Sequence, residues 1–331
     1  MKRINYKDNI ITIYGAKFSK EGFLIRMDEN VAKEVNQPTY DMNYYGVGVR
    51  FRFRTNSKIL KVEADVKDNR VDWAMPITGS CGFDVFCGKD RISIVNPYNY
   101  GVKHFEKEIQ LPGKMSTITI HAPRNEQILD LNFYIEDDAK IEKDKGYKYK
   151  KPIVFYGSSI TMGGCSSSSS KCYTSLVSSW LDSDFINLGF SGNAHGEAAM
   201  AEYIKDLDMS CFVMDYDHNA SSVKMLDDTH EKFFKIIRDA NPCLPIIIMT
   251  KPDFNNGKEE NIERRKIIKR TYDNAIKTGD KLVWFIDGET FFGKKDWSIC
   301  TVEECHPNDL GFYRMAKKIY PLLKRILESQ I

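Results

Sequence analysis

Five short apolar runs alternate with helix-like segments over residues 151–331, and this alternation restricts the folds open to that part of the chain. Runs of this length and character are typical of strands buried on both faces of a parallel sheet. The runs lie at residues 153–156, 185–188, 211–214, 245–250 and 282–286. The helix-like segments lie at residues 173–181, 197–207, 223–241, 259–279 and 310–327. The alternation predicts an α/β domain with a parallel, helix-covered sheet.

The first 145 residues follow a different pattern, in which apolar positions recur every second residue. Residues 45–54 read Tyr-Gly-Val-Gly-Val-Arg-Phe-Arg-Phe-Arg, which predicts a strand with one buried face and an arginine-bearing face in water. Further strand-like stretches lie at residues 9–14, 59–66, 83–86, 91–95, 105–111, 116–121 and 129–135. Short strands separated by turn-rich breaks predict an all-β sandwich. We therefore divide the chain into domains at residues 1–145 and 151–331, with the charged, lysine-rich residues 137–151 as the linker.

Charge and composition exclude several classes of partner. A net charge of +2 over 331 residues gives no strong field, so neither nucleic acid nor an acidic membrane is expected as a partner. No apolar run approaches the length needed to span a bilayer, and no uninterrupted apolar segment follows the basic N-terminus as in a secretory signal. The 8 cysteines are scattered without a Cys-x-x-Cys pair, which favours reduced thiols and a cytoplasmic location.

Polar residues gather where the predicted parallel strands end. They follow the first three strands and precede the last helix, at residues 157–161, 189–193, 215–220 and 303–309. In open α/β sheets, ligands bind in the crevice beyond the carboxyl ends of the strands. Any one of these groups is explained by a turn, but four at one edge of one sheet indicate a functional site.

The types of residue in these groups suggest acyl chemistry. Ser159 is a candidate nucleophile, but a hydroxyl needs a base to take its proton. His306 can take that proton near neutral pH, and Glu303 is close enough in sequence to orient its ring. The backbone N–H groups of Ser159 and Gly192 and the side-chain amide of Asn219 are candidate donors to an oxyanion.

These residues resemble the sequence blocks of the SGNH, or GDSL-type, hydrolases. Gly-Ser-Ser-Ile-Thr at residues 157–161 is similar to the first block, and Gly-Phe-Ser-Gly-Asn at 189–193 to the second. His-Asn at 218–219 takes the place of the third block, and residues 303–306 take that of the fifth, Asp-x-x-His. Gly-Phe-Asp-Val-Phe at 82–86 resembles the Gly-x-Asp-Leu-Tyr motif of the β-sandwich that precedes some of these esterases.

The resemblance implies a fold and a set of roles. The fold is a flavodoxin-like α/β/α hydrolase domain preceded by a jelly-roll-like sandwich. Ser159 matches the family's nucleophile, and Gly192, Asn219 and His306 match its other signature residues. The chain departs from the pattern at three positions, because Ser158 and Glu303 replace aspartates and Asp217 stands where the third block usually has glycine. Glu304 or a backbone carbonyl remains an alternative to Glu303.

Structural explanations compete for several other residues. Histidines 195, 218 and 230 are expected to be structural, or at most to contact substrate, and Asp287 is expected to serve as a turn or cap residue. Asp215, Asp217 and His218 lack a recognised metal-ligand spacing, so no metal and no cofactor are expected. The serine run at residues 166–170 predicts a mobile loop. Trp73 and the loop to Gly79 are the segment through which the first domain could reach the site.

The sequence as a whole predicts a serine esterase that removes short acyl groups, with O-acetyl groups on a sugar or oligosaccharide as the expected substrate. Two alternatives remain open, an acyltransferase acting on a sugar hydroxyl and a non-catalytic carbohydrate-binding protein. The oligomeric state is also open, a homo-oligomer included.

Overall fold

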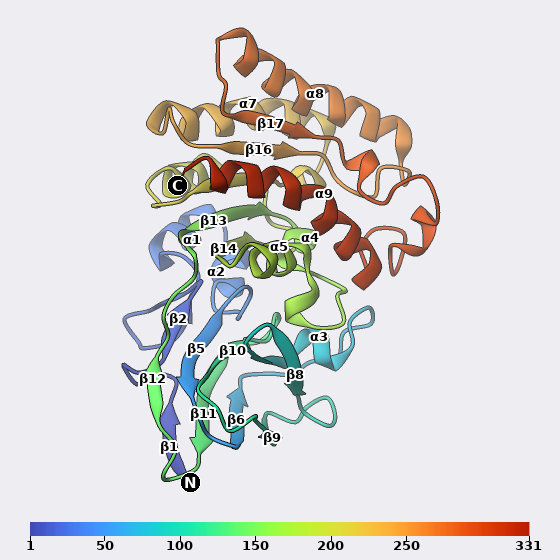
Figure 1. Ribbon diagram of the computed structural model, residues 1–331. Coiled ribbons are helices and arrows are strands. Elements are labelled where there is room, and N and C mark those ends of the chain that lie inside the picture. The colour runs from blue at the N-terminus through green and yellow to red at the C-terminus, as the bar shows by residue number, and fades with distance from the viewer. Residues whose placement is uncertain (331) are drawn as a thin grey trace.

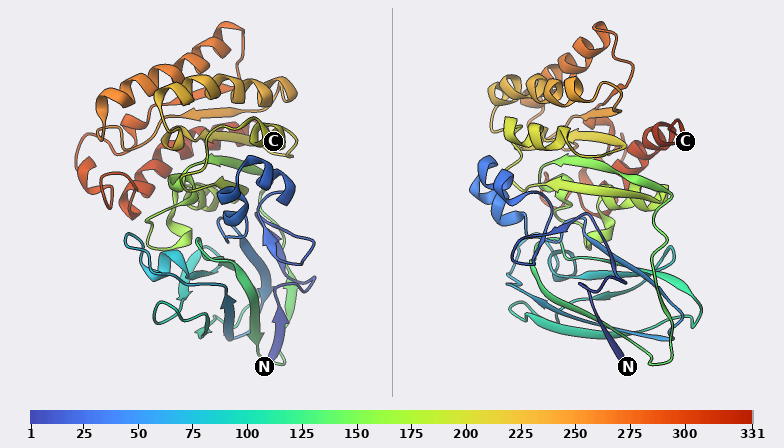
Figure 2. Two further views of the ribbon diagram at one scale, coloured as in Figure 1. Left: turned by 180° about the vertical axis from the view of Figure 1, so that it is seen from behind. Right: turned by 90° about the vertical axis from the view of Figure 1, so that its left-hand side faces the viewer.

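The computed structural model describes residues 1–330, which form a β-sandwich and an α/β domain stacked end to end (Figure 1). The N-terminus lies at the end of the sandwich far from the α/β domain, and the C-terminus lies beside the α/β sheet (Figures 1 and 2). None of the helices within residues 1–330 combines the length and the apolar character needed to cross a bilayer.

The α/β domain contains the predicted five-stranded parallel sheet. Its strands are β13 (Tyr149–Gly157), β14 (Ser183–Gly189), β15 (Cys211–Asp215), β16 (Ile246–Met249) and β17 (Val283–Ile286). Their spatial order is β14-β13-β15-β16-β17, and every neighbouring pair is parallel. The second strand of the domain thus lies outside the first, as in the flavodoxin-like order 2-1-3-4-5. The order reverses direction between β13 and β15, and the carboxyl ends of these two strands flank the crevice where such folds bind ligands.

Successive strand residues point to opposite faces of this sheet, so the apolar runs of its strands present apolar side chains on both faces. Helices cover both of these faces. They are α4 (Ser159–Met162), α5 (Tyr173–Leu181), α6 (Ala198–Lys205), α7 (Val223–Ala240), α8 (Lys258–Lys277) and α9 (Asp309–Glu328). Val154 and Tyr156 of β13 lie in the core with residues of α6, α7 and α8. Ile153 and Phe155 lie in a second core with residues of α5 and α9. The predicted α/β/α arrangement is confirmed.

Two antiparallel sheets form the sandwich. One has the order β1-β11-β6-β9 and consists of β1 (Lys2–Asn5), β11 (Ile128–Ile135), β6 (Ile59–Val66) and β9 (His104–Gln110). The other has the order β12-β5-β10-β7-β8, with β2 also paired to β5, and consists of β12 (Ile141–Lys143), β5 (Arg50–Thr55), β10 (Ser116–His121), β7 (Phe83–Cys87), β8 (Asp90–Val95) and β2 (Thr12–Tyr14). Strands β3 (Lys17–Phe18) and β4 (Leu24–Ile25) form a separate hairpin. In β6 every second residue is buried, as the alternating sequence predicts.

The prediction that residues 1–145 are entirely β is wrong, because this region also contains three helices. They are α1 (Glu29–Val35), α2 (Gln37–Met42) and α3 (Ile77–Ser80). Asp28 and Asn36 cap α1 and α2 through their side chains, a local signal that the search for period-2 strands passed over. Ala32 of α1 lies in the α/β core together with residues of α6, and Figure 2 shows both helices against the α/β domain.

The lysine-rich segment at residues 137–151 is not a free linker. Its residues 141–143 form β12, which pairs with β5, and β13 already begins at Tyr149. Asp144 accepts a hydrogen bond from the Tyr14 hydroxyl at 2.9 Å and pairs with Arg52 at 3.3 Å. The charges that suggest a solvated linker are therefore partly bound by the sandwich.

The prediction that the arginines of β5 face water is also wrong. The Arg50 side chain is fully buried and Arg52 is 9% exposed, and only Arg54 retains substantial contact with solvent. Arg50 pairs with Asp184, and its Nη1 donates to the carbonyl oxygen of Phe185 at 3.0 Å. Arg50 therefore joins β5 to the edge strand β14 of the other domain, whereas Arg52 pairs with Asp144 and Arg54 with Glu142.

The predicted mobile loop at residues 166–170 is instead packed between the two domains. Four of its five serines are buried. Arg124 Nη1 of the sandwich donates to Ser166 Oγ at 2.6 Å, and Asp84 accepts from the backbone N–H of Ser170 at 2.8 Å. Serine is small and hydrogen-bonds readily to both donors and acceptors, which suits it to a buried polar loop. Asp84, the aspartate of the motif at residues 82–86, thus fixes this loop.

Candidate active site

Strand β13 delivers Ser159 to the carboxyl edge of the sheet, as predicted. A Cβ on Gly157 would lie 2.1 Å from Thr161 Oγ1 and 2.3 Å from the carbonyl oxygen of Asp215, so only glycine fits between strand and turn. Ser158 is the N-cap of α4, and its Oγ accepts from the N–H of Ile160 at 3.1 Å. The serine that replaces the family's usual aspartate therefore still anchors the turn. Ser159 follows as the first residue of α4, where its own N–H has no acceptor within the helix.

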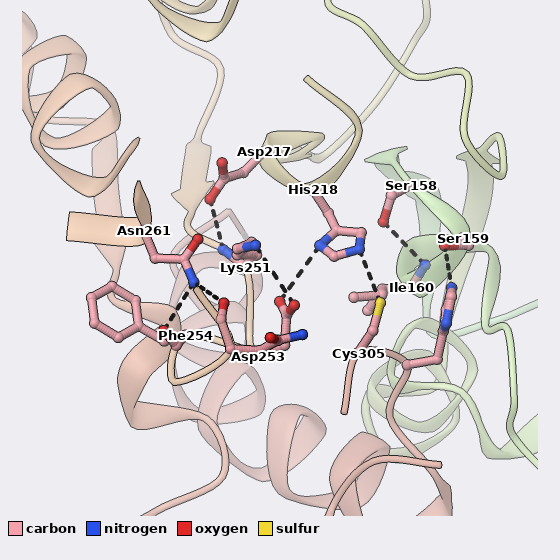
Figure 3. Close-up of polar contacts among 12 residues, drawn as sticks. Ser158, Ser159, Ile160, Asp217, His218, Lys251, Asp253, Phe254, Asn261 and Cys305 are labelled. Atoms are coloured by element: carbon pink, nitrogen blue, oxygen red, sulfur yellow. Dashed lines mark hydrogen bonds and ion pairs between the residues drawn. The ribbon is translucent and has the colours of Figure 1, made fainter. Parts of the chain in front are cut away.

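The structure brings Ser159 and His306 together although 147 positions separate them. Ser159 Oγ lies 2.7 Å from His306 Nε2, within hydrogen-bond distance (Figure 3). A bridge between Thr301 and Pro307 and the start of α9 hold the histidine in place. The side chain of Asn308 caps α9 by accepting from two N–H groups of its first turn. His306 therefore precedes a helix start, as the sequence indicates, and also contacts the serine.

Glu303 provides the carboxylate next to His306. It contacts His306 Nδ1, and its two oxygens lie 3.1 and 3.2 Å from the backbone nitrogen of the same residue. Glu304 adopts a left-handed φ of 68°, which turns the chain between Glu303 and His306. Burial by itself lowers the pKa of His306, but contacts with Cys305 and Glu303 outweigh burial and leave that pKa above its ordinary value.

Replacing Glu303 by glutamine tests whether this carboxylate orients the imidazole. We expect Glu303→Gln to lower kcat for an ester substrate about 10²–10⁴-fold, because an amide does not stabilise the imidazolium and can hold the wrong tautomer. The measurement is the steady-state rate of aryl acetate hydrolysis. The matched control, Glu304→Gln, is expected to stay close to the wild-type rate. If Glu303→Gln hydrolysed the ester near the wild-type rate and Glu304→Gln were slow, Glu304 would be the residue that orients the imidazole.

The two other candidate oxyanion donors lie on neighbouring loops. Gly192 has a φ of 70°, and a Cβ there would meet no atom within 4 Å, so the space beside its Cα is open. Asn219 lies in the 3-10 helix η2 (Asp217–Asn219), and its Oδ1 accepts from the N–H of Ala194 at 3.4 Å. This contact ties η2 to the loop that carries Gly192. Within residues 1–330 the Nδ2 group of Asn219 has no hydrogen-bond acceptor, so it is free to donate to a ligand.

A second chain of polar side chains, which the sequence reasoning missed, lies beside the first. Cys305 Sγ is 3.1 Å from His218 Nε2, and His218 Nδ1 is 3.5 Å from Asp253 Oδ1 (Figure 3). The rings of His218 and His306 lie edge to face with their centroids 6.3 Å apart. Asp253 follows β16 at the carboxyl edge of the sheet, and this position in the sequence could have indicated that it belongs to the site.

The aspartates considered as metal ligands serve other contacts. Asp215 accepts hydrogen bonds from Thr161 Oγ1 at 2.8 Å and from the Tyr173 hydroxyl at 2.7 Å. Burial raises the pKa of Asp215 to about 7, an effect that these two hydrogen bonds oppose. Asp217 accepts from the backbone N–H of Lys251 at 3.0 Å and pairs with Arg264. Both aspartates thus hold neighbouring elements in place around η2.

Two sets of donor atoms within residues 1–330 lie close together at the site. The donor atoms of Cys165, Glu303 and His306 are within 4.8 Å of one another, and so are those of His218, Asp253 and Cys305. We assign neither set to a metal, because the imidazoles already contact the carboxylates and the Cys305 thiol.

The remaining predicted residues have structural contacts. His230 is buried against Thr271 Oγ1 at 2.8 Å, and burial lowers its pKa to about 3, so it is neutral. His195 Nε2 lies 3.0 Å from the carbonyl oxygen of Gly192 and thereby contacts the loop of that glycine. Asp287 caps the 3-10 helix η3 (Gly288–Thr290), as expected.

The sandwich contacts the α/β domain beside the site through the loop that follows Trp73. Thr78 Oγ1 donates to the carbonyl oxygen of Ser167 at 2.8 Å, and a Cβ on Gly79 would lie 2.4 Å from that of Ser166. Trp73 itself is 80% exposed. The sandwich therefore supports the serine loop next to α4, and Trp73 remains open to solvent.

A parallel sheet in the order 2-1-3-4-5, with a serine and a histidine paired at its switch point, places the chain among the α/β/α hydrolases. The sequence model of the GDSL-like lipase/acylhydrolase family matches residues 150–324, and the chain belongs to this family. A second model, for the N-terminus of SGNH-hydrolase-type esterases, matches residues 1–141. The resemblance seen in the sequence is thereby confirmed.

Solved structures share the whole two-domain fold. A protein described as a GDSL-like lipase from Bacteroides ovatus ATCC 8483 is 26% identical, with a TM-score of 0.88 over 99% of this chain and 98% of that one. The salicylyl-acyltransferase SsfX3 from a tetracycline biosynthetic pathway is 19% identical, with a TM-score of 0.81 over 99% and 97%. A family two carbohydrate esterase from Clostridium thermocellum, in complex with cellohexaose, is 14% identical, with a TM-score of 0.64 over 96% and 99%. A search of curated proteins found no significant match.

Proposed function

We propose that this chain is a serine esterase that removes short acyl groups, with O-acetyl groups on a carbohydrate as the expected substrate. The observation that carries the proposal is the 2.7 Å contact between Ser159 Oγ and His306 Nε2, with Glu303 at the other ring nitrogen. This order of hydroxyl, imidazole and carboxylate is the arrangement that activates a serine for attack on an ester.

The proposed reaction proceeds through an acyl-enzyme. His306 Nε2 takes the Ser159 proton as Oγ bonds to the ester carbonyl carbon, and the carbonyl oxygen becomes an oxyanion. Three donors are proposed to bind that oxyanion, the N–H groups of Ser159 and Gly192 and the Nδ2 group of Asn219. The imidazolium then protonates the leaving alkoxide as the ester bond breaks. Water, deprotonated by the same imidazole, attacks the acyl-enzyme and releases the acid.

A pocket beside the site supports a carbohydrate as the alcohol portion of the substrate. It has a volume of about 360 Å³ and is lined by Pro252, Asp253, Phe254, Asn255, Asn256, Phe292, Trp297, Ser298, Thr301 and Glu304. Aromatic side chains offer apolar contact area, while the amides and hydroxyls can hydrogen-bond to sugar hydroxyls. The fold shared with a carbohydrate esterase is consistent with this substrate class.

The pH dependence of hydrolysis tests the role of His306 as the base. A protonated imidazole cannot accept the Ser159 proton, and the pKa of His306 is raised above its ordinary value of 6.5. We therefore expect kcat/KM to rise with pH through an inflection above 6.5. Glu303→Gln removes one cause of the raised pKa, so its remaining activity should show a lower inflection. A wild-type inflection at or below 6.5 would contradict this account.

Acyl transfer to a sugar hydroxyl is the second candidate, because the fold is shared with an acyltransferase. The two activities are distinguished by incubating an aryl acetate with the protein and a saccharide acceptor, then measuring acetate and acetylated saccharide by mass spectrometry. Free acetate as the main product supports the esterase, and acetylated saccharide supports the transferase. If a fluorophosphonate fails to label Ser159 while saccharides still bind, the third alternative, a non-catalytic carbohydrate-binding protein, is favoured.

We also propose a cytoplasmic location, which rests on the free state of all the cysteines.

A further inference from the structure

The side chains of Cys305, His218 and Asp253 are arranged in the same order as those of Ser159, His306 and Glu303, the residues of the proposed esterase reaction. In both, a nucleophilic atom contacts Nε2 of an imidazole and a carboxylate faces Nδ1. Figure 3 shows the His218 ring between Asp253 and Cys305, with Ser159 to one side. The proposed esterase reaction gives no role to Cys305, His218 or Asp253.

The burial of Asp253 and His218 indicates that these two side chains form a charged pair. Asp253 is only 5% exposed, and its Oδ2 lies 3.6 Å from Lys251 Nζ. Its Oδ1 faces His218 Nδ1 at 3.5 Å, and neither of these two atoms has a hydrogen-bond partner within residues 1–330. An isolated buried carboxylate is costly, whereas one that faces an imidazolium is compensated. Burial lowers the pKa of His218, but the contacts with Asp253 and Cys305 outweigh burial and raise it to about 10. The imidazole is therefore protonated at neutral pH and can stabilise a thiolate.

The pKa of the Cys305 thiol is shifted in the opposite direction from that of four buried cysteines. Burial raises the pKa of its thiol, but the contacts with His218 and His306 outweigh burial and leave that pKa below its ordinary value. Burial instead dominates and raises the pKa of the thiols of Cys81, Cys165, Cys211 and Cys300. Cys305 is also only half-buried, so small reagents can reach it. Thiolate character and access together determine the reactivity of a cysteine.

We infer that Cys305, held by His218 and Asp253, is an activated thiolate and a covalent modification site for small electrophiles, with hydrogen peroxide as the natural reagent class. In the proposed reaction, the thiolate sulfur attacks one oxygen of hydrogen peroxide, forming an S–O bond as the O–O bond breaks. The leaving hydroxide takes the proton of the His218 imidazolium and departs as water. Sulfur is oxidised by two electrons, the peroxide is reduced, and Cys305 becomes a sulfenic acid.

Several charged or titratable groups surround this thiol and enter its pH dependence. His218 and His306 contact it or lie directly beside it, and Asp253 and Lys251 lie behind His218. The other neighbours with which the thiol or His218 interacts are Cys165, Asp215 and Asp217. The two imidazoles favour the thiolate, and the carboxylate of Asp253 acts on it through His218.

The experiment measures the rate of iodoacetamide labelling of each cysteine in the full chain between pH 5.5 and 9, by peptide mass spectrometry. Cys243 is the internal control, because it is exposed and precedes β16 at the opposite edge of the sheet. We expect the rate at Cys243 to fall about tenfold from pH 7 to pH 6, as for an exposed thiol, while the rate at Cys305 falls less steeply. Parallel profiles for the two cysteines, or no labelling of Cys305 at any pH, would overturn the inference.

Variants and peroxide complete the test. His218→Gln and Asp253→Asn should each lower the Cys305 rate at pH 6, about tenfold for His218→Gln, with the Cys243 rate unchanged. The check on folding is that Cys211, which is fully buried, stays unlabelled. Peroxide followed by dimedone should add the mass of the dimedone adduct at Cys305 and not at Cys243. Unchanged Cys305 rates in both folded variants, or an adduct confined to Cys243, would count against the proposal.

A consequence for hydrolysis rests on the proposed function. An adduct at Cys305 would lie next to His306, so ester hydrolysis should be lost in parallel with Cys305 labelling. If Cys305 is labelled as expected but the unmodified protein hydrolyses no ester, the thiol inference stands and the esterase proposal fails. If the protein hydrolyses esters but Cys305 does not react, the thiol inference alone fails.

Discussion

Ser159→Ala is expected to lower kcat/KM for a small aryl acetate by at least about 10⁴-fold, because it removes the hydroxyl oxygen that lies 2.7 Å from His306 Nε2. What remains should be the modest acceleration that oxyanion donors and binding provide without a nucleophile. The measurement is initial-rate hydrolysis, with circular dichroism and thermal unfolding to show that the fold is intact.

Ser158→Ala is the matched control, since it removes the neighbouring hydroxyl. Ser158 caps α4 through the N–H of Ile160, so the variant should lose about 1 kcal/mol of stability and retain most of its hydrolysis. Turnover by Ser159→Ala at a rate near wild type, or loss of turnover in Ser158→Ala alone, would refute the assignment of the nucleophile.

The second large effect is expected in stability. Arg50→Met should lower the free energy of unfolding by about 3–5 kcal/mol, because it leaves Asp184 with its burial cost and without its partner. The lost contacts include the hydrogen bond to the carbonyl oxygen of Phe185 and the stacking of the guanidinium on the Phe185 ring, 3.9 Å from its centroid. Urea unfolding followed by circular dichroism measures the change.

The pH dependence of this loss gives a further check. Burial raises the pKa of Asp184 above its ordinary value, an effect that Arg50 opposes, so removing Arg50 should raise that pKa further. Protonation of Asp184 removes the unpaired charge, and the deficit of Arg50→Met should therefore shrink as the pH falls through that pKa.

Arg54→Met is the control on the same strand. Arg54 pairs with Glu142 near the surface, where both partners retain solvent, and such pairs contribute at most about 1 kcal/mol. Equal losses for the two variants would show that the Arg50 contact does not hold the domains together.

Much of the fold could be predicted from patterns that depend on neighbouring residues. Strand β6 shows its buried face as every second residue, and the strand at residues 153–156 shows burial on both faces as an unbroken apolar run. The positions of Ser159 and His306 followed from the rule that polar residues after parallel strands gather at one edge. The helices α1 and α2 were missed because their capping signals are short and adjoin strand-rich sequence.

Contacts between remote segments could not be predicted in the same way. Arg50 and the serines at 166–170 are polar residues that the partner domain buries, and Cys305 meets His218 only because two loops converge. The sequence by itself determined the strand and helix periodicities, the edge where chemistry gathers and the residue types available there. Only the tertiary structure decided which polar groups leave water and what compensates them, because burial and charge pairing depend on surfaces that fold together from distant parts of the chain.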